Sequence, residues 1–318
     1  MNPTTAMAPA GDEASAELSR NVIRAFEDLS GRHPGFRPAH AKGILLSGLF
    51  VPAAGGSSLT RAPHLHRAST PVSVRFSNFA GVPNIPDGNP DSSPRGMAIR
   101  FHLADHVHTD ITAHSVNAFP GRTAEEFVEF LQAIHGGGSS IQAFLGTHPA
   151  ALAFVQAPKP TPSSFAEESF FSVSAYKFVN ADGVSQFGRY RVVPMVQSHY
   201  LDAAEAAAKP VDFLFDEIHE RLASSPVKFR IIVQVAQEGD VVDDSTVQWP
   251  DERPVLEFGT VELTSATPNN DEEQRHIIFD PIPRVDGIET SGDPLLEARA
   301  DAYLMSGRRR RKMEEGDL

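Results

Sequence analysis

The sequence predicts an α+β fold in which an eight-stranded antiparallel β-barrel carries flanking helices. Eight short β-rich runs are separated by clusters of Gly, Pro, Asn and Asp. These runs fall into two groups of four, and helical segments split the groups. A parallel doubly wound sheet would instead need strict alternation of strands and helices. One domain of about 300 residues fits this order best.

The first predicted element is an amphipathic helix near the amino end. Its apolar residues recur at steps of three and four, and they are Leu18, Val22, Ile23, Phe26 and Leu29. Gly31 and Pro34 end the pattern. Residues 1–15 are expected to be a disordered leader, and residues 16–318 a single domain.

Strands and helices then follow in a regular order. The first group of predicted strands comprises residues 43–51, 72–80, 96–103 and 110–116. A helix follows from Thr123, which forms a capping-box pattern with Glu126, and one or two short helices are expected within 139–157. The second group comprises residues 170–179, 188–196, 228–237 and 255–264, with a helical segment near 201–224.

The charge balance and the absence of cysteine exclude several classes of protein. The 318 residues contain 28 basic and 41 acidic side chains, a net charge of −13 that disfavours nucleic acid and anionic lipid as partners. The basic run Arg308–Lys312 is expected to be a solvated end. Without cysteine, any metal must take nitrogen or oxygen ligands. No apolar run is long enough to span a bilayer, and cytoplasm is the predicted location.

Familiar catalytic motifs are missing, but polar residues stand where a core would favour apolar ones. There is no dinucleotide fingerprint, P-loop, serine-hydrolase elbow or zincin helix. Arg37 and His40 lie at the entrance to the first strand, and Arg75 and Ser77 lie in the second. Because strand side chains alternate, Arg75 and Ser77 share a face, and an arginine that faces inward needs an anion.

A second candidate group lies near the carboxyl end. Asp293 is a good helix N-cap, and Pro294 suits the first turn. Arg299 and Tyr303 then lie four residues apart on one helical face. A guanidinium beside a phenol stabilises the phenolate, which makes Tyr303 a candidate ligand for ferric iron.

Each of these residues, taken alone, more often has a structural role. A lone histidine such as His40 is commonly a hydrogen-bonded structural residue, and a lone Tyr303 commonly belongs to a core. The pairs His64 with His66 and His106 with His108 could bind a divalent metal on one strand face. No third ligand stands at a sensible spacing, so surface histidines are favoured there.

Together, however, the motifs resemble the haem catalase core, and in particular its short branch, the catalase-related peroxidases. The resemblance rests on the ordered set RPAHAKG, VRFSNFAG, PRGMAIRF, KFVNADG, QWP, PVLEFGTVEL, DGIE and the spacing RxxxYxxxxxxR, from about Leu18 to Arg310. It implies haem b bound inside a large eight-stranded antiparallel barrel.

The resemblance also implies roles for individual residues. His40 matches the distal catalytic histidine, and Ser77 matches the serine that orients it. Tyr303 matches the axial tyrosine of catalases, and Arg299 the arginine that keeps its oxygen ionised. Three further residues match the arginines that hold the haem propionates, and they are Arg37, Arg75 and Arg310.

Several departures from the family pattern favour peroxidase over catalase chemistry. Where catalases have an asparagine pair, either His114 or Asn117 is expected to be the distal donor, with Asn117 favoured. Ser93 stands in place of a channel aspartate, and Gly307 in place of a histidine. The C-terminal helical and flavodoxin-like extensions and the NADPH site of larger catalases are expected to be absent.

The predicted function is therefore a haem-dependent peroxidase that reduces hydrogen peroxide or organic hydroperoxides through a ferryl intermediate. A small organic reductant is the expected partner, with weak catalase activity besides, no NADPH, and a monomer or homodimer as the assembly. Two alternatives stay open. One is a catalase-like enzyme that converts fatty-acid hydroperoxides, and the other is a non-catalytic haem or lipid carrier.

Overall fold

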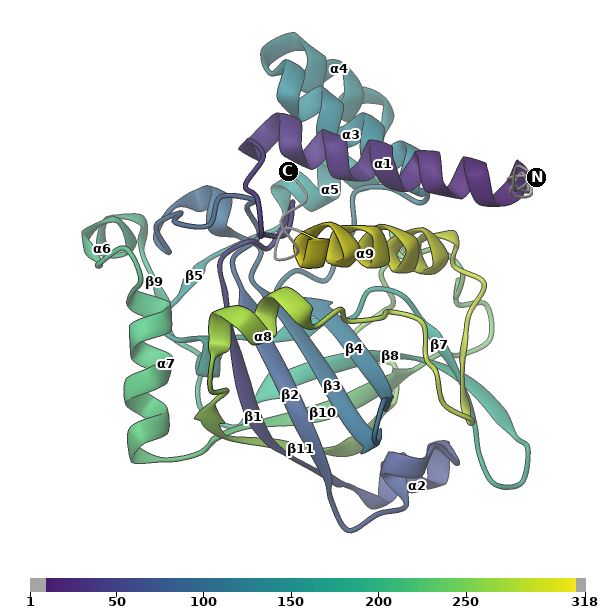
Figure 1. Ribbon diagram of the computed structural model, residues 1–318. Helices are drawn as coiled ribbons and strands as arrows, with labels where there is room; N and C mark the ends of the chain where they lie inside the picture. The colour runs from purple at the N-terminus through teal and green to yellow at the C-terminus, as the bar shows by residue number, and fades with distance from the viewer. Residues whose placement is uncertain (1–9, 313–318) are drawn as a thin grey trace, which may run out of the picture.

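The described part of the chain, residues 10–312 of the computed structural model, is built around a closed antiparallel barrel (Figure 1). Neighbouring strands pair in the order β10–β11–β1–β2–β3–β4–β6–β8, and β8 pairs with β10 to close the ring. The eight strands are β1 (Gly43–Pro52), β2 (Thr70–Ser77), β3 (Gly96–Ala104), β4 (Val107–His114), β6 (Phe170–Phe171), β8 (Ser185–Pro194), β10 (Val227–Val235) and β11 (Val255–Ala266). The predicted fold class is confirmed.

The strand predicted over residues 170–179 is divided in two. Its first part, β6, fills the gap in the barrel between β4 and β8. Its second part, β7 (Tyr176–Val179), pairs with the other end of β8 and with β12 (Ile288–Thr290) outside the ring. A further short pair joins β5 (Thr161–Pro162) to β9 (Tyr200–Leu201).

The barrel interior is packed with side chains. Inward-facing Val72, Val74 and Phe76 of β2 join one core cluster with residues from every long strand of the ring. The Phe76 ring stacks on Phe165, with centroids 5.1 Å apart, and also contacts Phe229. The expectation of haem inside the barrel is therefore wrong. Alternation along β2 puts Val74 and Phe76 inside, so Arg75 and Ser77 face outward.

The surface position expected for His64 is also wrong. Instead of lying on the surface, it is 1% exposed, because the short helix η1 (Pro63–Leu65) folds onto β1 and β3. Its ring lies 4.7 Å from that of Phe101 and 5.8 Å from that of Phe258. The side chain of His106 is 95% exposed, as predicted. Within residues 10–312, no group of three or more potential ligand residues could hold a metal.

Helices cover one outer face of the barrel. α1 (Ala10–Ser30) packs against α3 (Ala124–Gly136) and α9 (Pro294–Lys312), and α9 lies above the ends of β1–β4 in Figure 1. The α3 boundary follows its sequence signals, since Thr123 Oγ1 accepts a hydrogen bond from the backbone N–H of Glu126. The remaining helices are α2 (Ala54–Leu59), α4 (Gly138–Thr147), α5 (Pro149–Gln156), α6 (Ala203–Ala208), α7 (Phe213–Ser224) and α8 (Asn270–His276).

Both ends of the described chain differ from what the sequence predicted. Residues 10–15 of the predicted leader are helical, since α1 begins at Ala10, and residues 1–9 lie outside the described part. At the other end, Arg308, Arg309 and Arg311 are exposed whereas Arg310 is 4% exposed.

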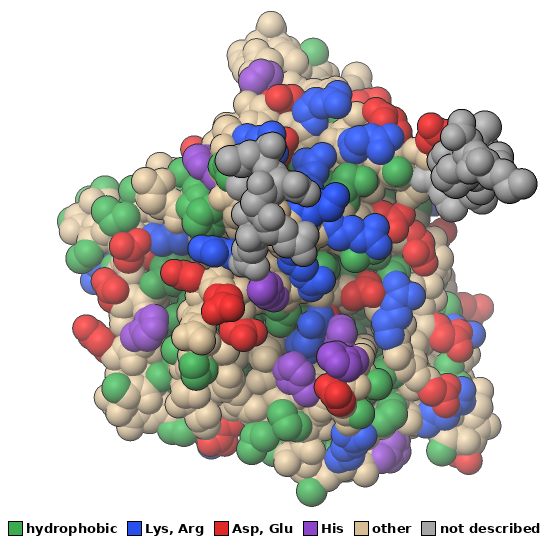
Figure 2. Space-filling view, in the orientation of Figure 1, with side chains coloured by type: hydrophobic (Ala, Val, Ile, Leu, Met, Phe, Trp, Pro, Cys, Tyr) green, Lys and Arg blue, Asp and Glu red, His purple; other side chains and the backbone are tan. Residues whose placement is uncertain are grey.

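Figure 2 shows basic side chains gathered over α1 and α9, although the protein as a whole is acidic. Among the described helices, none is both long and apolar enough to cross a lipid bilayer.

Candidate active site

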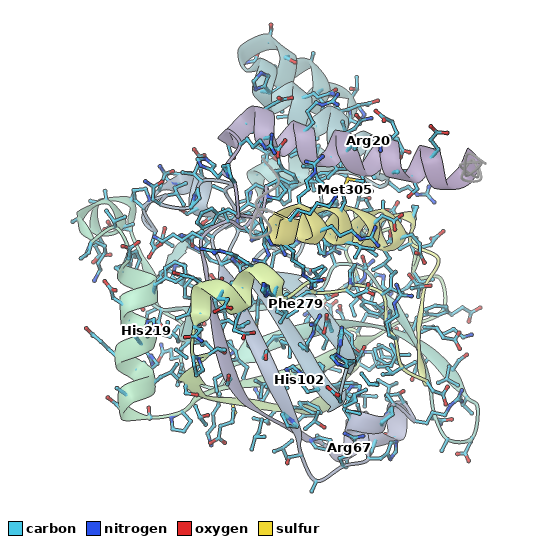
Figure 3. All side chains as sticks on the ribbon, in the orientation of Figure 1. Arg20, Arg67, His102, His219, Phe279 and Met305 are labelled. Carbon is cyan, nitrogen blue, oxygen red and sulfur yellow. The ribbon has the colours of Figure 1, made fainter. Side chains whose placement is uncertain are left out.

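A cavity of about 590 Å³ lies between the outer face of β2–β4 and the helices α1, α3 and α9. Its volume is typical of pockets that hold small molecules and cofactors. Phe279, which lies beneath α9 in Figure 3, forms part of its wall. The cavity brings together nearly all the predicted site residues, namely His40, Ser77, Arg37, Arg75, Arg299, Tyr303 and Arg310.

One row of residues across the sheet forms a first side of the site. Ser77 pairs with Gly96, and Gly96 pairs with His114, so the three lie side by side on β2, β3 and β4. The imidazole of His40 rests on Gly96, where its Nδ1 is 3.0 Å from Ser77 Oγ. A Cβ at Gly96 would lie 2.6 Å from that oxygen and 2.7 Å from that nitrogen. Only glycine therefore allows the imidazole to approach the strand this closely.

The backbone holds His40 in an uncommon conformation. Its φ of 56° lies in the left-handed region, which costs a residue with a side chain about 1 kcal/mol or more. The backbone N–H of His40 donates to the carbonyl of Phe79 at 2.7 Å, and the two rings meet edge to face. Two residues later, Lys42 forms a buried ion pair with Asp87 at 2.6 Å. These contacts fix the position of the imidazole.

The surroundings keep His40 uncharged. Burial, followed by the charges of Arg75 and other nearby cations, lowers the pKa of His40 to about 3. No described residue forms a hydrogen bond with Nε2, whereas Nδ1 is next to Ser77. His40 is therefore a neutral base, oriented by a hydroxyl group, with a free nitrogen available to a ligand.

Two residues of α9 form the opposite side of the site. Arg299 Nε and Nη2 each lie 3.3 Å from the Tyr303 oxygen, and Arg299 Nη2 also donates to Thr112 at 2.9 Å. Although burial disfavours the charged guanidinium, the nearby oxygens of Tyr303 and Tyr176 raise the pKa of Arg299 overall. A permanent cation thus donates two hydrogen bonds to the phenol oxygen, an arrangement that stabilises a phenolate.

The buried Arg75 and Arg310 and the partly exposed Arg37 form a cluster without acidic partners among the described residues. In residues 10–312, the guanidinium groups of Arg37, Arg75 and Arg310 bond only to backbone carbonyls and to neutral side chains. Burial and the other two charges hold the pKa of Arg37 well below its usual value. Burial and Arg310 lower the pKa of Arg75 to about 9. Such a cluster suits an anionic ligand, because buried cations are otherwise paired.

The set of donors fits haem. Its two propionates supply the anionic charges that the arginine cluster needs, and a phenolate is a suitable ligand for its iron. The middle residue of each row is small: Gly96 lies between Ser77 and His114, and Ala98 lies between Arg75 and Thr112 in the neighbouring row. The remaining wall is mostly apolar, with Phe26, Phe79, Phe127, Phe130 and Phe154 among its residues, although Asp91 and Lys159 also line it.

One predicted site residue is misplaced. Asn117 does not line the cavity, and its backbone carbonyl accepts a hydrogen bond from Gln248 instead. The preference for Asn117 over His114 was therefore wrong. The reason is that β4 ends at His114, which still faces the cavity, and the chain turns away before residue 117.

Residues 31–314 match the profile of the family described as "Catalase". The chain belongs to the catalase family. This family binds haem and acts on peroxide, so the expected oxidoreductase class and the resemblance to its short branch are confirmed. A "Catalase-related peroxidase" of Mycolicibacterium paratuberculosis is 34% identical over 93% of this chain and 95% of that protein. A second "Catalase-related peroxidase", of Synechococcus elongatus, is 31% identical over 94% of this chain and 91% of that protein.

Longer catalases share the core only. Catalase-2 of Bacillus subtilis is 27% identical, and the match covers 84% of this chain but 42% of that protein. Among solved structures, catalase A of Saccharomyces cerevisiae aligns with a TM-score of 0.78 at 21% identity, over 92% of this chain and 64% of that one. A fungal catalase aligns with a TM-score of 0.77 at 21% identity, and the alignment covers 98% of this chain and 66% of that one. This catalase-family chain thus spans under two thirds of those structures, which support its fold.

Several residues of the site have no sequence signal. Gln274 of α8 accepts a hydrogen bond from Arg75 at 2.8 Å, and the carbonyl of Ile277 accepts from Arg37 at 3.0 Å. Both contacts join segments about 200 residues or more apart, which local patterns do not reveal. The sequence could have indicated Thr112 as a site residue, because it lies two residues before His114 and so shares its strand face.

Proposed function

We propose that the protein is a haem-dependent peroxidase that reduces hydrogen peroxide or organic hydroperoxides with electrons from a small organic donor. The observation that carries the proposal is that two reactive groups line one cavity. One is the neutral imidazole of His40, which has a free nitrogen, and the other is the phenol of Tyr303, which is held by Arg299. A haem or lipid carrier has no use for an oriented base.

Tyr303 would hold the iron, and Arg37, Arg75 and Arg310 would hold the propionates. When bound, haem supplies a ferric iron at which peroxide is reduced. His40 accepts the proton of the peroxide at Nε2 and returns it to the departing oxygen, a role that contributes about 10² to 10⁴ in rate. Ser77 fixes the ring plane through Nδ1. Arg299 keeps electron density on the Tyr303 oxygen.

The outer wall of the cavity favours organic hydroperoxides over hydrogen peroxide alone. It consists of apolar side chains of α1, α3 and α5, among them Val22, Phe26, Phe127, Ile134 and Phe154. Apolar walls retain an alkyl or aryl group by burying its surface. The same observation keeps conversion of fatty-acid hydroperoxides as a second candidate. Product analysis after mixing with a lipid hydroperoxide distinguishes them, because a peroxidase yields the alcohol and consumes the donor.

The deciding experiment is the absorption spectrum of the protein expressed with ample haem, before and after peroxide. The proposal expects a phenolate-type ferric spectrum that changes on mixing and returns when a phenolic donor is added. Tyr303→Phe should lose most of the bound haem, whereas His40→Ala should keep it and react about 10² times more slowly or worse. An unchanged Soret band in Tyr303→Phe would contradict the assignment of Tyr303.

The proposal has further parts that separate measurements test. They are haem b as the cofactor, the absence of bound NADPH, a monomeric or homodimeric assembly, and the cytoplasm as the location. A pyridine haemochrome spectrum, extraction of nucleotides, light scattering and cell fractionation check them in turn. Haem of another type, a retained nucleotide, a larger oligomer or an exported protein would each contradict its part.

A further inference from the structure

One buried imidazole on the cavity wall has no task in the mechanism above. His114 ends β4 and lines the cavity. Both of its ring nitrogens are buried, and neither has a hydrogen-bond partner among the described residues. Buried polar atoms in native proteins almost always have a partner. A group that binds in the cavity would supply the one that His114 lacks.

The strand register places His114 beside His40. Ser77 and His114 are the two neighbours of Gly96 across the sheet, so their side chains rise from the same face about 10 Å apart. The ring of His40 rests on Gly96, between them. Ser77 therefore flanks His40 on one side and His114 lies on the other.

The charges around His114 keep it neutral. Burial, followed by the charge of Arg299 on α9, lowers the pKa of His114 to about 3, and Lys159 after α5 adds to the effect. A polar contact of the ring with the Val116 backbone, outside hydrogen-bond geometry, opposes the shift. The other titratable neighbour is His40, which is also neutral. A neutral imidazole has one nitrogen with a free lone pair, so it can accept a proton once an anion binds beside it.

We propose that His114 is a second proton acceptor of the cavity, which takes the proton of a weak acid when that acid binds in the cavity as its anion. The inference rests on the proposed function, since it requires a ligand at haem iron. The weak acid HX gives its proton to the imidazole, X⁻ stays bound, and no proton enters the solvent. A half-turn about Cβ–Cγ exchanges ring nitrogens and carbons, so His114 can present a nitrogen without moving its backbone.

An asparagine or glutamine side chain at this position could donate a hydrogen bond but could not accept a proton. This difference defines the test. Hydrogen cyanide is mixed with the haem-loaded protein in weakly buffered solution near pH 7, and proton release is followed with an indicator dye. Three variants are compared, namely His40→Ala, the double variant His40→Ala/His114→Gln, and the matched control His40→Ala/His102→Gln. His102 is exposed on β3 and does not line the cavity.

We expect His40→Ala and the control to release almost no proton per cyanide bound, because His114 accepts it. The double variant at His114 should release about one proton. Release of about one proton by His40→Ala itself, or equal release with and without His114, would overturn the inference. His114→Asn replaces His114→Gln if the latter does not fold. Failure of the wild-type protein to take up haem or bind cyanide would contradict the proposed function and this inference together.

Discussion

The contact between Gly96 and the imidazole of His40 allows a quantitative prediction. A Cβ added at Gly96 would lie 2.7 Å from His40 Nδ1 and 2.8 Å from Cε1. Ordinary contact begins near 3.5 Å, so the ring must withdraw by about 0.8 Å in Gly96→Ala. The Nδ1 to Ser77 Oγ distance of 3.0 Å then exceeds hydrogen-bond range. Misplacement of a catalytic group by about 1 Å costs on the order of 10² in rate.

The assay is stopped-flow reduction of peroxide by the haem-loaded Gly96→Ala variant. We expect the rate to fall by about 10², while haem content stays the same because the residues proposed to hold haem are unaltered. Gly146→Ala is the matched control, because a Cβ at this α4 glycine meets nothing within 4 Å. A Gly96→Ala rate within about twofold of wild type would refute the claim that the imidazole position depends on this glycine.

Three further outcomes are expected. Burial lowers the pKa of His64 to about 3, below its unfolded value of about 6.5, so unfolding takes up a proton and stability falls as pH drops from about 6.5 towards 3. Urea unfolding of the apoprotein should show that His64→Gln reduces this dependence by about one proton, and an equal slope would contradict it. Asp87→Ala should lower the free energy of unfolding by about 3 kcal/mol or more, because it leaves an exposed carboxylate as the one charged partner of the buried Lys42 ammonium among the described residues; a loss below about 1 kcal/mol would count against this. Gly307→Ala should weaken haem retention about tenfold, because its Cβ would lie 2.2 Å from Ile278 Cδ1 and push this side chain, which lines the cavity, against the bound group. Haem transfer to apomyoglobin measures it, and a wild-type transfer rate would exclude this packing role.

Local patterns predicted much of this fold. Alternation along β2 predicted that Arg75 and Ser77 share one face, and helical spacing predicted that Arg299 and Tyr303 lie together. Alternation alone did not show which face of β2 points into the barrel. In the structure, Val74 and Phe76 belong to the barrel core, so Arg75 on the other face of the strand points outward.

Other features depended on contacts between distant segments. The preference for Asn117 failed because the point at which β4 stops pairing is set by Gly96 and Phe171, which lie elsewhere in the chain. His64 looked like a surface residue because a histidine between loop residues has no pattern that indicates burial. Both cases involve side chains whose surroundings come from tertiary packing, which periodicity does not encode.

The cavity wall is assembled from opposite extremes of the chain, because α1 and His40 come early and α9 comes last. During synthesis the barrel strands leave the ribosome before Arg299, Tyr303 and Arg310 do. A nascent chain therefore has an incomplete cofactor site until α9 has left the ribosome. Binding of the cofactor has to follow the emergence of α9, and the barrel strands alone cannot supply Arg299, Tyr303 or Arg310.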